Sequence, residues 1–202
     1  NCYRSQGAAG TVPLRLNLDE TFLCLFQGSV AGNVMLTKKR ARQLVQRVPA
    51  GKRRCCMTHV GVICDRTDIQ PLLPQVLIMN ERTAPARQMA ALRAAAPSNV
   101  RLVRQKSAWT NILLTAWIIR LLGVALRPYL GTHQPILFLD SLRAHWHPLV
   151  LFACRCAGIW PICVPASLTW LLQPLDTHAF RKYKAYLRRI YQEVRGEEER
   201  SD

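Results

Sequence analysis

The stretch LRLNLDETFLCLF, residues 14–26, alternates leucine, phenylalanine and cysteine with polar side chains. Alternation with a period of two predicts a half-buried β-strand, with one face in the core and one polar face. Asp19 lies near the middle of the polar face, although strands disfavour Asp. Glu20 is expected to point to the opposite face, so the two carboxylates do not share a site. Asp19 is therefore a candidate functional residue.

A second stretch, PILFLD at residues 135–140, is a continuous apolar run that ends in Asp140. Such a run is typical of a parallel strand that is covered on both faces. Periodicity and turn residues predict the remaining elements. They are strands over 56–64, 75–79 and 159–164, helices over 109–126, 142–157 and 177–194, and one short helix within 81–99.

The predicted order is three strands, helix, strand, helix, strand, helix. An antiparallel meander followed by right-handed crossovers gives an α/β fold, a mixed five-stranded sheet with helices on both faces. The strand over 135–140 can then lie parallel beside the first strand, which brings Asp140 next to Asp19. Asp176, at the start of the last helix, approaches both from the side.

The length and the charge set the domain count and the partner class. The 202 residues suit one domain over 14–195, with an N-terminal extension over 1–13 and an acidic tail, expected to fray, over 196–202. The chain has 28 Lys and Arg against 12 Asp and Glu, a formal net charge of +16. Such an excess favours nucleic acid as a partner first and an anionic membrane surface second.

The stretch 108–126 is apolar enough to be compared with a membrane span. Asn111, Thr115 and Arg120 interrupt it, and an Arg near mid-bilayer costs about 2.5 kcal/mol or more. We therefore interpret it as a buried helix of a soluble protein without a membrane partner. The eight cysteines include no C-x-x-C pair, and we interpret them as reduced thiols of an intracellular protein.

Three converging carboxylates repel one another unless cations neutralise them. Oxygen ligands favour Mg²⁺ or Mn²⁺, and two such ions can activate a water or a 3′-hydroxyl and stabilise the leaving oxygen of a phosphodiester. A basic surface holds the nucleic-acid backbone. The candidates for DNA contacts are Lys38, Lys39, Arg40, Lys52, Arg53, Arg54 and Lys182. A solvated loop is the alternative interpretation of the run over 38–54.

Three blocks carry a family resemblance: LNLDET (16–21), FLDSLRAHWHP (138–148) and VPASLTWLLQPLDTHAFRKYK (164–184). They resemble the acidic blocks of the DDE superfamily endonucleases, and within these the pogo and Tigger-like transposases of the mariner group. The third block is the most specific, and the interval of 35 residues between the second and third acids is also similar.

The resemblance implies an RNase H-like fold and a cut-and-paste DNA transposase core. It implies that Asp19, Asp140 and Asp176 hold two Mg²⁺ (or Mn²⁺) ions for nicking and for attack by the freed 3′-hydroxyl. It further implies DNA as the partner, a homodimer in a synaptic complex and, in a eukaryote, a nuclear location. Ser141 stands where relatives usually place Asn, and no helix-turn-helix domain precedes the core, so the chain alone is expected to lack sequence specificity.

Other interpretations stay open. A domesticated or decayed derivative binds DNA without cutting it, and an RNase H-type nuclease acts outside transposition. Taken singly, Asp176 is a helix N-cap and Asp140 a turn residue. The neighbouring His145, His147 and His178 are candidate ligands or phosphate contacts, but we interpret them as hydrogen-bonded structural or surface residues. The tryptophans at 109, 117 and 170 are interpreted as core.

Overall fold

The computed structural model describes residues 10–24 and 56–201 of the chain. They form a mixed six-stranded sheet of order β4-β3-β2-β1-β5-β6. The strands are β1 (Val12–Cys24), β2 (Cys56–Cys64), β3 (Gln75–Asn80), β4 (Val100–Gln105), β5 (His133–Leu139) and β6 (Trp160–Cys163). β2 is antiparallel to β1 and to β3, whereas β5 pairs parallel with both β1 and β6, as predicted. The mixed α/β sheet is that of an RNase H-like fold.

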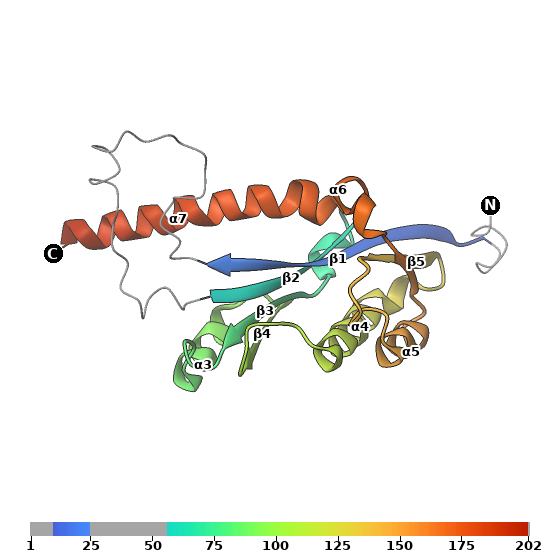
Figure 1. The fold of residues 1–202 in the computed structure, drawn as a ribbon, viewed down its shortest axis with the longest axis horizontal. Coiled ribbons are helices and arrows are strands. Elements are labelled where there is room, and N and C mark those ends of the chain that lie inside the picture. Colours follow the sequence, from blue (N-terminus) through green and yellow to red (C-terminus); the bar gives the residue numbers. More distant parts are fainter. Residues whose placement is uncertain (1–9, 25–55, 202) are drawn as a thin grey trace.

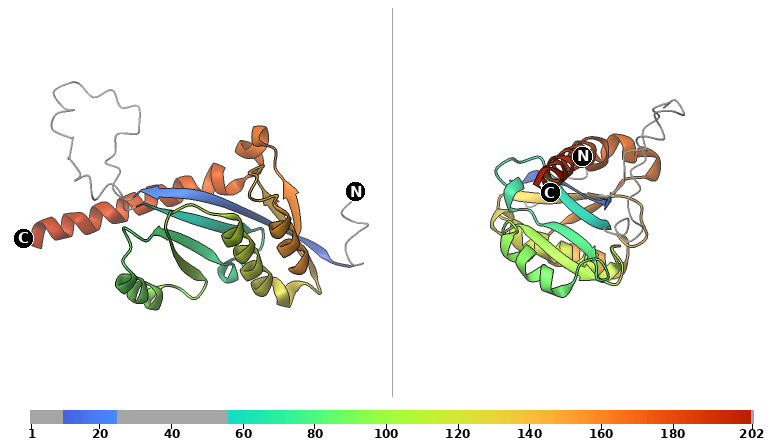
Figure 2. Two further views of the ribbon diagram at one scale, coloured as in Figure 1. Left: turned by 60° about the horizontal axis from the view of Figure 1, so that its bottom comes forward. Right: turned by 90° about the vertical axis from the view of Figure 1, so that its left-hand side faces the viewer.

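Helices cover both faces of the sheet. Those of eight residues or more are α3 (Ala86–Ala95), α4 (Ile112–Leu126), α5 (Pro148–Cys156) and α7 (Phe180–Ser201). In Figure 1, α7 lies above the sheet, whereas α3, α4 and α5 lie below it, and the end-on view of Figure 2 shows the same separation. Before α7 the chain passes through the short helix α6 (Thr169–Leu172) and the π-helical turn η5 (Leu175–Ala179).

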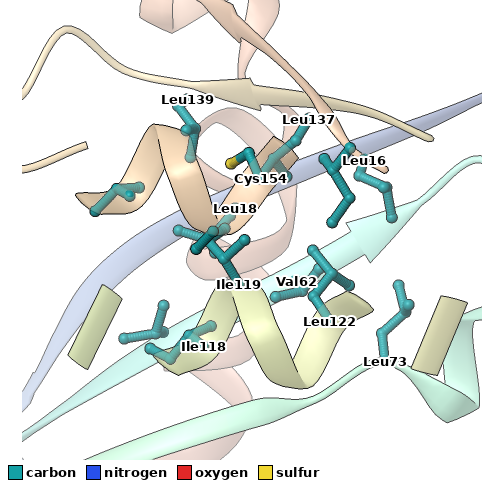
Figure 3. Packing of buried hydrophobic residues seen from close by; sticks show 14 of the residues in the cluster. Leu16, Leu18, Val62, Leu73, Ile118, Ile119, Leu122, Leu137, Leu139 and Cys154 are labelled. Atoms are coloured by element: carbon teal, nitrogen blue, oxygen red, sulfur yellow. The ribbon is translucent and has the colours of Figure 1, made fainter. Parts of the chain in front are cut away.

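The hydrophobic core lies between the sheet and the layer of α4 and α5. Figure 3 shows side chains of β1, β2 and β5 packed against Ile118, Ile119 and Leu122 of α4 and against Cys154 of α5. Leu14, Leu16 and Leu18 are the residues of β1 that enter this core. Burial of such side chains contributes about 1.5–3 kcal/mol each. This core fixes β1 and β5 side by side in the centre of the molecule.

The middle of β1 is buried on both faces, so the prediction of a half-buried strand was wrong there. Asn17, Asp19 and Thr21, on its polar face, are all less than 9% exposed. Their cover comes from the other end of the chain, since η5 lies against β1 on the side opposite α4. Alternation along the strand could not reveal a cover supplied by a distant segment.

Three predictions about individual elements were wrong: one strand was missed and two helix boundaries differ. The sheet has six strands because β4 pairs parallel with β3 at the edge, where Arg101 and Arg104 are exposed. The helix expected over 142–157 begins only at Pro148, since a series of turns occupies 141–147. The last helix continues to Ser201, so the segment expected to be a separate frayed tail is helical.

α4 is covered on one side only, which also differs from the prediction. Leu113 and Val124 are more than 70% exposed, and Trp109, just before the helix, stacks on Phe22 at the surface instead of entering the core. By length and composition Ile112–Tyr129 could cross a membrane, and among the described residues it is the one helical stretch that could. One face of α4 belongs to the core of the domain.

The packing of α4 on α5 predicts the effect of a single methyl group. A Cβ at Gly123 would lie 2.6 Å from the Cβ of Ala157, at the end of α5. We expect Gly123→Ala to lower the free energy of unfolding by about 1–3 kcal/mol, because overpacking exceeds the gain in helix propensity. Urea denaturation measures the loss, and Ala157→Gly in the same chain restores it. Gly131→Ala, whose Cβ meets nothing within 4 Å, is the control; equal stability of the two single variants contradicts the prediction.

Candidate active site

Asp19 lies in the middle of β1, directly opposite Gly61 of β2. Its side chain is buried, with the residue 8% exposed. Oδ1 accepts a hydrogen bond from the backbone N–H of Glu20 at 2.8 Å, whereas Oδ2 is enclosed and has no partner among the described residues. A buried carboxylate oxygen without a donor is costly unless a cation or a proton satisfies it.

The environment of Asp19 opposes its negative charge. Burial, offset in part by the hydrogen bond from Glu20 N–H, and the nearby charges of Asp176 and Asp140 raise its pKa from 3.8 to about 7. Asp176 is also close enough to share a hydrogen bond with Asp19 when one of the two is protonated. The structure therefore brings the three predicted acids into one electrostatic neighbourhood, although they come from residues 19, 140 and 176.

The side-chain amide of Asn17 positions the segment that carries Asp176. Its Nδ2 donates to the carbonyl oxygen of Phe138 on β5 at 3.3 Å, and its Oδ1 accepts from the backbone N–H of Leu175 at 3.1 Å. Asn17 is 3% exposed, so both bonds lie in the interior. The amide thus connects β1, β5 and η5 two residues before Asp19.

A glycine allows η5 and α7 to approach the strands. A Cβ at Gly61 would lie 3.1 Å from the ring of Phe180 and 3.3 Å from the side chain of Leu175. The π-helical turn between these two residues carries Asp176, which is exposed. The backbone N–H and the hydroxyl of Thr177 both donate to the carbonyl oxygen of Gln173, so the turn preceding α7 is held at its base. Single π turns are frequent at functional sites.

Asp140 follows β5, and three hydrogen bonds hold it. Its Oδ1 accepts from His145 Nδ1 at 2.6 Å and from the backbone N–H of Leu142 at 3.0 Å. Its carbonyl oxygen accepts from the indole N–H of Trp146 at 2.8 Å. The hydrogen bond from His145 is the main reason why the pKa of Asp140 is lowered from its ordinary value, against the opposing effect of burial. Asp140 is thus ionised and oriented before any ligand binds.

His145 is buried between two carboxylates. Its Nε2 lies 3.7 Å from Oε1 of Glu20, on the side opposite its bond to Asp140. Burial lowers its pKa, but the interactions with Asp140 and Glu20 outweigh this effect and raise the pKa to about 9. The prediction that this histidine is structural holds for its burial, although its partner is one of the predicted acids. His147 caps α5 by accepting from Leu149 N–H, and His178 is exposed.

Within the described parts of the chain, no group of three His, Cys, Asp or Glu side chains is arranged to hold a metal ion. The acids nevertheless have the chemistry that a hard cation requires. Asp19 offers an enclosed oxygen without a donor, and Asp140 offers an oriented, ionised carboxylate. Oxygen ligands of this kind match Mg²⁺ and Mn²⁺. The residues therefore fit a divalent cation.

Of the predicted DNA contacts, one can be placed. Lys182 is exposed on the first turn of α7, as is its neighbour Arg181. Lys38, Lys39, Arg40, Lys52, Arg53 and Arg54 lie outside the described residues. The start of α7 thus presents positive charge next to Asp176, on the face of the sheet that carries Asp19.

The fold and the site define a class of protein. The strand order 3-2-1-5-6 is that of an RNase H-like fold. One acid lies on β1, the second directly follows the adjacent β5, and the third lies just before the last helix, which makes an acidic site. The chain belongs to the DDE superfamily endonucleases, whose family model matches residues 58–201. The match includes Asp140 and Asp176 and begins after Asp19. No curated protein and no solved structure matches the chain.

Sequence reasoning missed the residues that support the acids. Asn17, Gly61 and Glu20 were not predicted to act at the site, and His145 was interpreted as structural. Two of them carry a signal, because strands disfavour both Asn and Gly in their interior. For Glu20 and His145 no local signal exists, since their contact joins residues 125 positions apart. Their roles follow only from the pairing of β1 with β5.

The raised pKa of Asp19 predicts how its replacement affects stability. A carboxyl whose folded pKa is about 7 and whose unfolded value is 3.8 stabilises the fold below pH 3.8, and the contribution is lost as the pH rises to 7. Asp19→Asn, which mimics the protonated acid, is expected to unfold like the wild type at pH 4. At pH 8 without metal it is expected to be more stable by on the order of 2–4 kcal/mol.

Thermal denaturation over this pH range, with EDTA present, tests the expectation. Adding Mn²⁺ is expected to raise the melting temperature of the wild type but not that of Asp19→Asn, because the asparagine amide does not replace the carboxylate as a ligand of the cation. A variant that is less stable than the wild type at every pH contradicts this account of Asp19.

The Asn17 bridge predicts a second change. Asn17→Ala removes both amide bonds and leaves the N–H of Leu175 without an acceptor, a loss of about 1–3 kcal/mol. Urea denaturation measures the loss, and the amide hydrogen of Leu175 is expected to exchange faster. Asn80→Ala also removes two amide bonds, one to Lys106 O and one from Arg82 N–H, but both are exposed, so it is the control with a smaller loss. Equal losses and unchanged exchange at Leu175 exclude the role given to Asn17.

Proposed function

We propose that the chain is the catalytic core of a cut-and-paste DNA transposase, a metal-dependent endonuclease and strand transferase. The observation that carries the proposal is the enclosed, unpartnered oxygen of Asp19 beside the charges of Asp140 and Asp176. Three acids so arranged destabilise one another until cations bind. Membership of the DDE superfamily endonucleases supports DNA as the substrate class.

Asp19, Asp140 and Asp176 are the proposed ligands of two Mg²⁺ or Mn²⁺ ions. Such ions supply Lewis-acid stabilisation of the phosphodiester and lower the pKa of a bound water or 3′-hydroxyl. The chain itself orients the acids: Asn17 holds the turn that carries Asp176, and the donors of His145 and Leu142 hold Asp140. The exposed cations Arg181 and Lys182 lie where they can hold a phosphate backbone near the acids.

The setting of the activity is part of the proposal. The net charge of +16 favours DNA over a neutral partner. Joining two element ends requires two catalytic cores, so the proposed working form is a homodimer in a synaptic complex. An enzyme with this substrate acts inside the cell, and in a eukaryote it acts in the nucleus.

A second candidate is a domesticated or decayed derivative that binds DNA without cutting it. It is favoured by two observations. No group of three metal-binding side chains is assembled within the described residues, and Ser141, beside Asp140, is exposed where relatives usually place Asn. Against it, Asp19 keeps a buried acid that costs stability in the absence of a cation. Metal-dependent cleavage separates the two candidates.

A plasmid-nicking assay tests the proposal. We expect the chain to convert supercoiled plasmid to the open circle when Mg²⁺ or Mn²⁺ is present, but not in a buffer with EDTA and no added divalent cation. We expect Asp140→Asn to reduce nicking to the level seen in EDTA. Asp68→Asn, an exposed acid paired with Arg66, is the matched control and is expected to nick like the wild type.

Each other outcome selects an alternative. Binding of plasmid without nicking, together with no heat of Mn²⁺ binding by calorimetry, supports the non-cutting derivative. Faster cleavage of an RNA–DNA hybrid than of duplex DNA supports an RNase H-type nuclease. Nicking that survives Asp140→Asn excludes the assigned acids.

A further inference from the structure

The pair Glu20–His145 lies behind Asp140, on the side of β1 opposite Asp19. Adjacent residues of a strand point to opposite faces, so Asp19 faces η5 whereas Glu20 faces the layer of α4 and α5. The ring of His145, which is 1% exposed, fills the space between Glu20 and Asp140. Its backbone N–H donates to Leu142 O at 2.9 Å, so the turn after β5 fixes the position of the ring.

The ring has a specific relation to each acid. Nδ1 lies 2.6 Å from Oδ1 of Asp140, a short distance typical of a charge-assisted hydrogen bond. Nε2 lies 3.7 Å from Oε1 of Glu20, and both atoms are enclosed with no hydrogen-bond partner among the described residues. The carboxylate of Glu20 and the ring of His145 are therefore each other's nearest charge partner on this side of the ring. A histidine that only filled core space would not need an acid on either side.

These contacts restrict the carboxylate of Asp140. Oδ1 is occupied by two donors, His145 Nδ1 and Leu142 N–H, and the main-chain carbonyl of Asp140 is held by the indole of Trp146. None of the described residues donates a hydrogen bond to Oδ2. The carboxylate cannot rotate without breaking these bonds, so one defined oxygen is left for a ligand.

We propose that Glu20 and His145 are positioning residues for the metal site. His145 holds Oδ1 of Asp140 so that Oδ2 alone is presented to the cation, and Glu20 holds the ring of His145 from the other face of β1. This inference rests on the function proposed above. Residues that orient metal-binding carboxylates in this way typically change metal affinity or activity 10–100-fold when replaced.

The two ring nitrogens can be tested separately. In His145→Asn the amide nitrogen takes the place of Nδ1 and can still donate to Asp140, whereas in His145→Gln it takes the place of Nε2 and reaches Glu20 only. Glu20→Gln removes the charge that faces Nε2. His147→Asn, in the same turn, is the matched control, because Asn is a favoured N-cap and the residue does not contact the acids.

Calorimetric titration of each full-length variant with Mn²⁺ gives the first measurement, and the kcat and KM of plasmid nicking give the second. We expect His145→Gln to weaken Mn²⁺ binding about 10–100-fold and to lower kcat, with KM for DNA unchanged. His145→Asn is expected to bind Mn²⁺ more tightly than His145→Gln, Glu20→Gln to show a smaller loss, and His147→Asn to match the wild type.

The outcomes separate this inference from the proposed function. If the wild type neither binds Mn²⁺ nor nicks DNA, the proposed function fails, and the inference fails with it. If the wild type does both and His145→Gln stays within about twofold of its affinity, well short of the loss expected for an orienting residue, the inference alone fails. Should His145→Gln not fold, as thermal denaturation shows, Glu20→Gln and His145→Asn decide: wild-type Mn²⁺ affinity in both overturns the positioning role.

Discussion

The side-chain amide of Asn17 is the interaction on which the site depends. It donates to a backbone carbonyl of β5 and accepts from the first backbone N–H of η5. These partners lie 121 and 158 residues away from Asn17 in the chain, so the amide joins three segments. Because it is buried, neither bond can be replaced by water at low cost. Asp19, Asp140 and Asp176 come from these same three segments. The amide therefore helps to hold the three acids near one another, in addition to the pairing of β1 with β5.

The site shows a conflict between stability and function. Burial and the neighbouring acids raise the pKa of Asp19 to about 7, so the metal-free protein at neutral pH holds a carboxylate that its surroundings disfavour. Asp140 is treated in the opposite way, since His145 and Leu142 stabilise its ionised form. Such unequal environments are common where groups act together on one ligand. The divalent cation that we propose would relieve the conflict at Asp19 and use the orientation already present at Asp140.

The elements that were predicted correctly are those whose own residues carry the pattern. β2 was predicted at its observed bounds, and the parallel position of β5 beside β1 followed from the short apolar run that ends in Asp140. β4 was missed because it is a short edge strand whose two exposed residues, Arg101 and Arg104, make it resemble a solvated loop in sequence. The exposed face of α4 was missed because apolar residues all round a helix predict a cover that the described chain does not supply.

The sequence by itself determined the three acids, the strand alternation that separates Asp19 from Glu20, and the positive charge that favours DNA. These are local properties, since composition and a period of two are present in any short window of the chain. Only the tertiary structure decided that the polar face of β1 is buried and that Glu20 reaches Asp140 through His145. The reason is physical, because burial and charge pairing depend on which distant segments are in contact. Here those contacts are the pairing of β1 with β5 and the packing of η5 over Gly61.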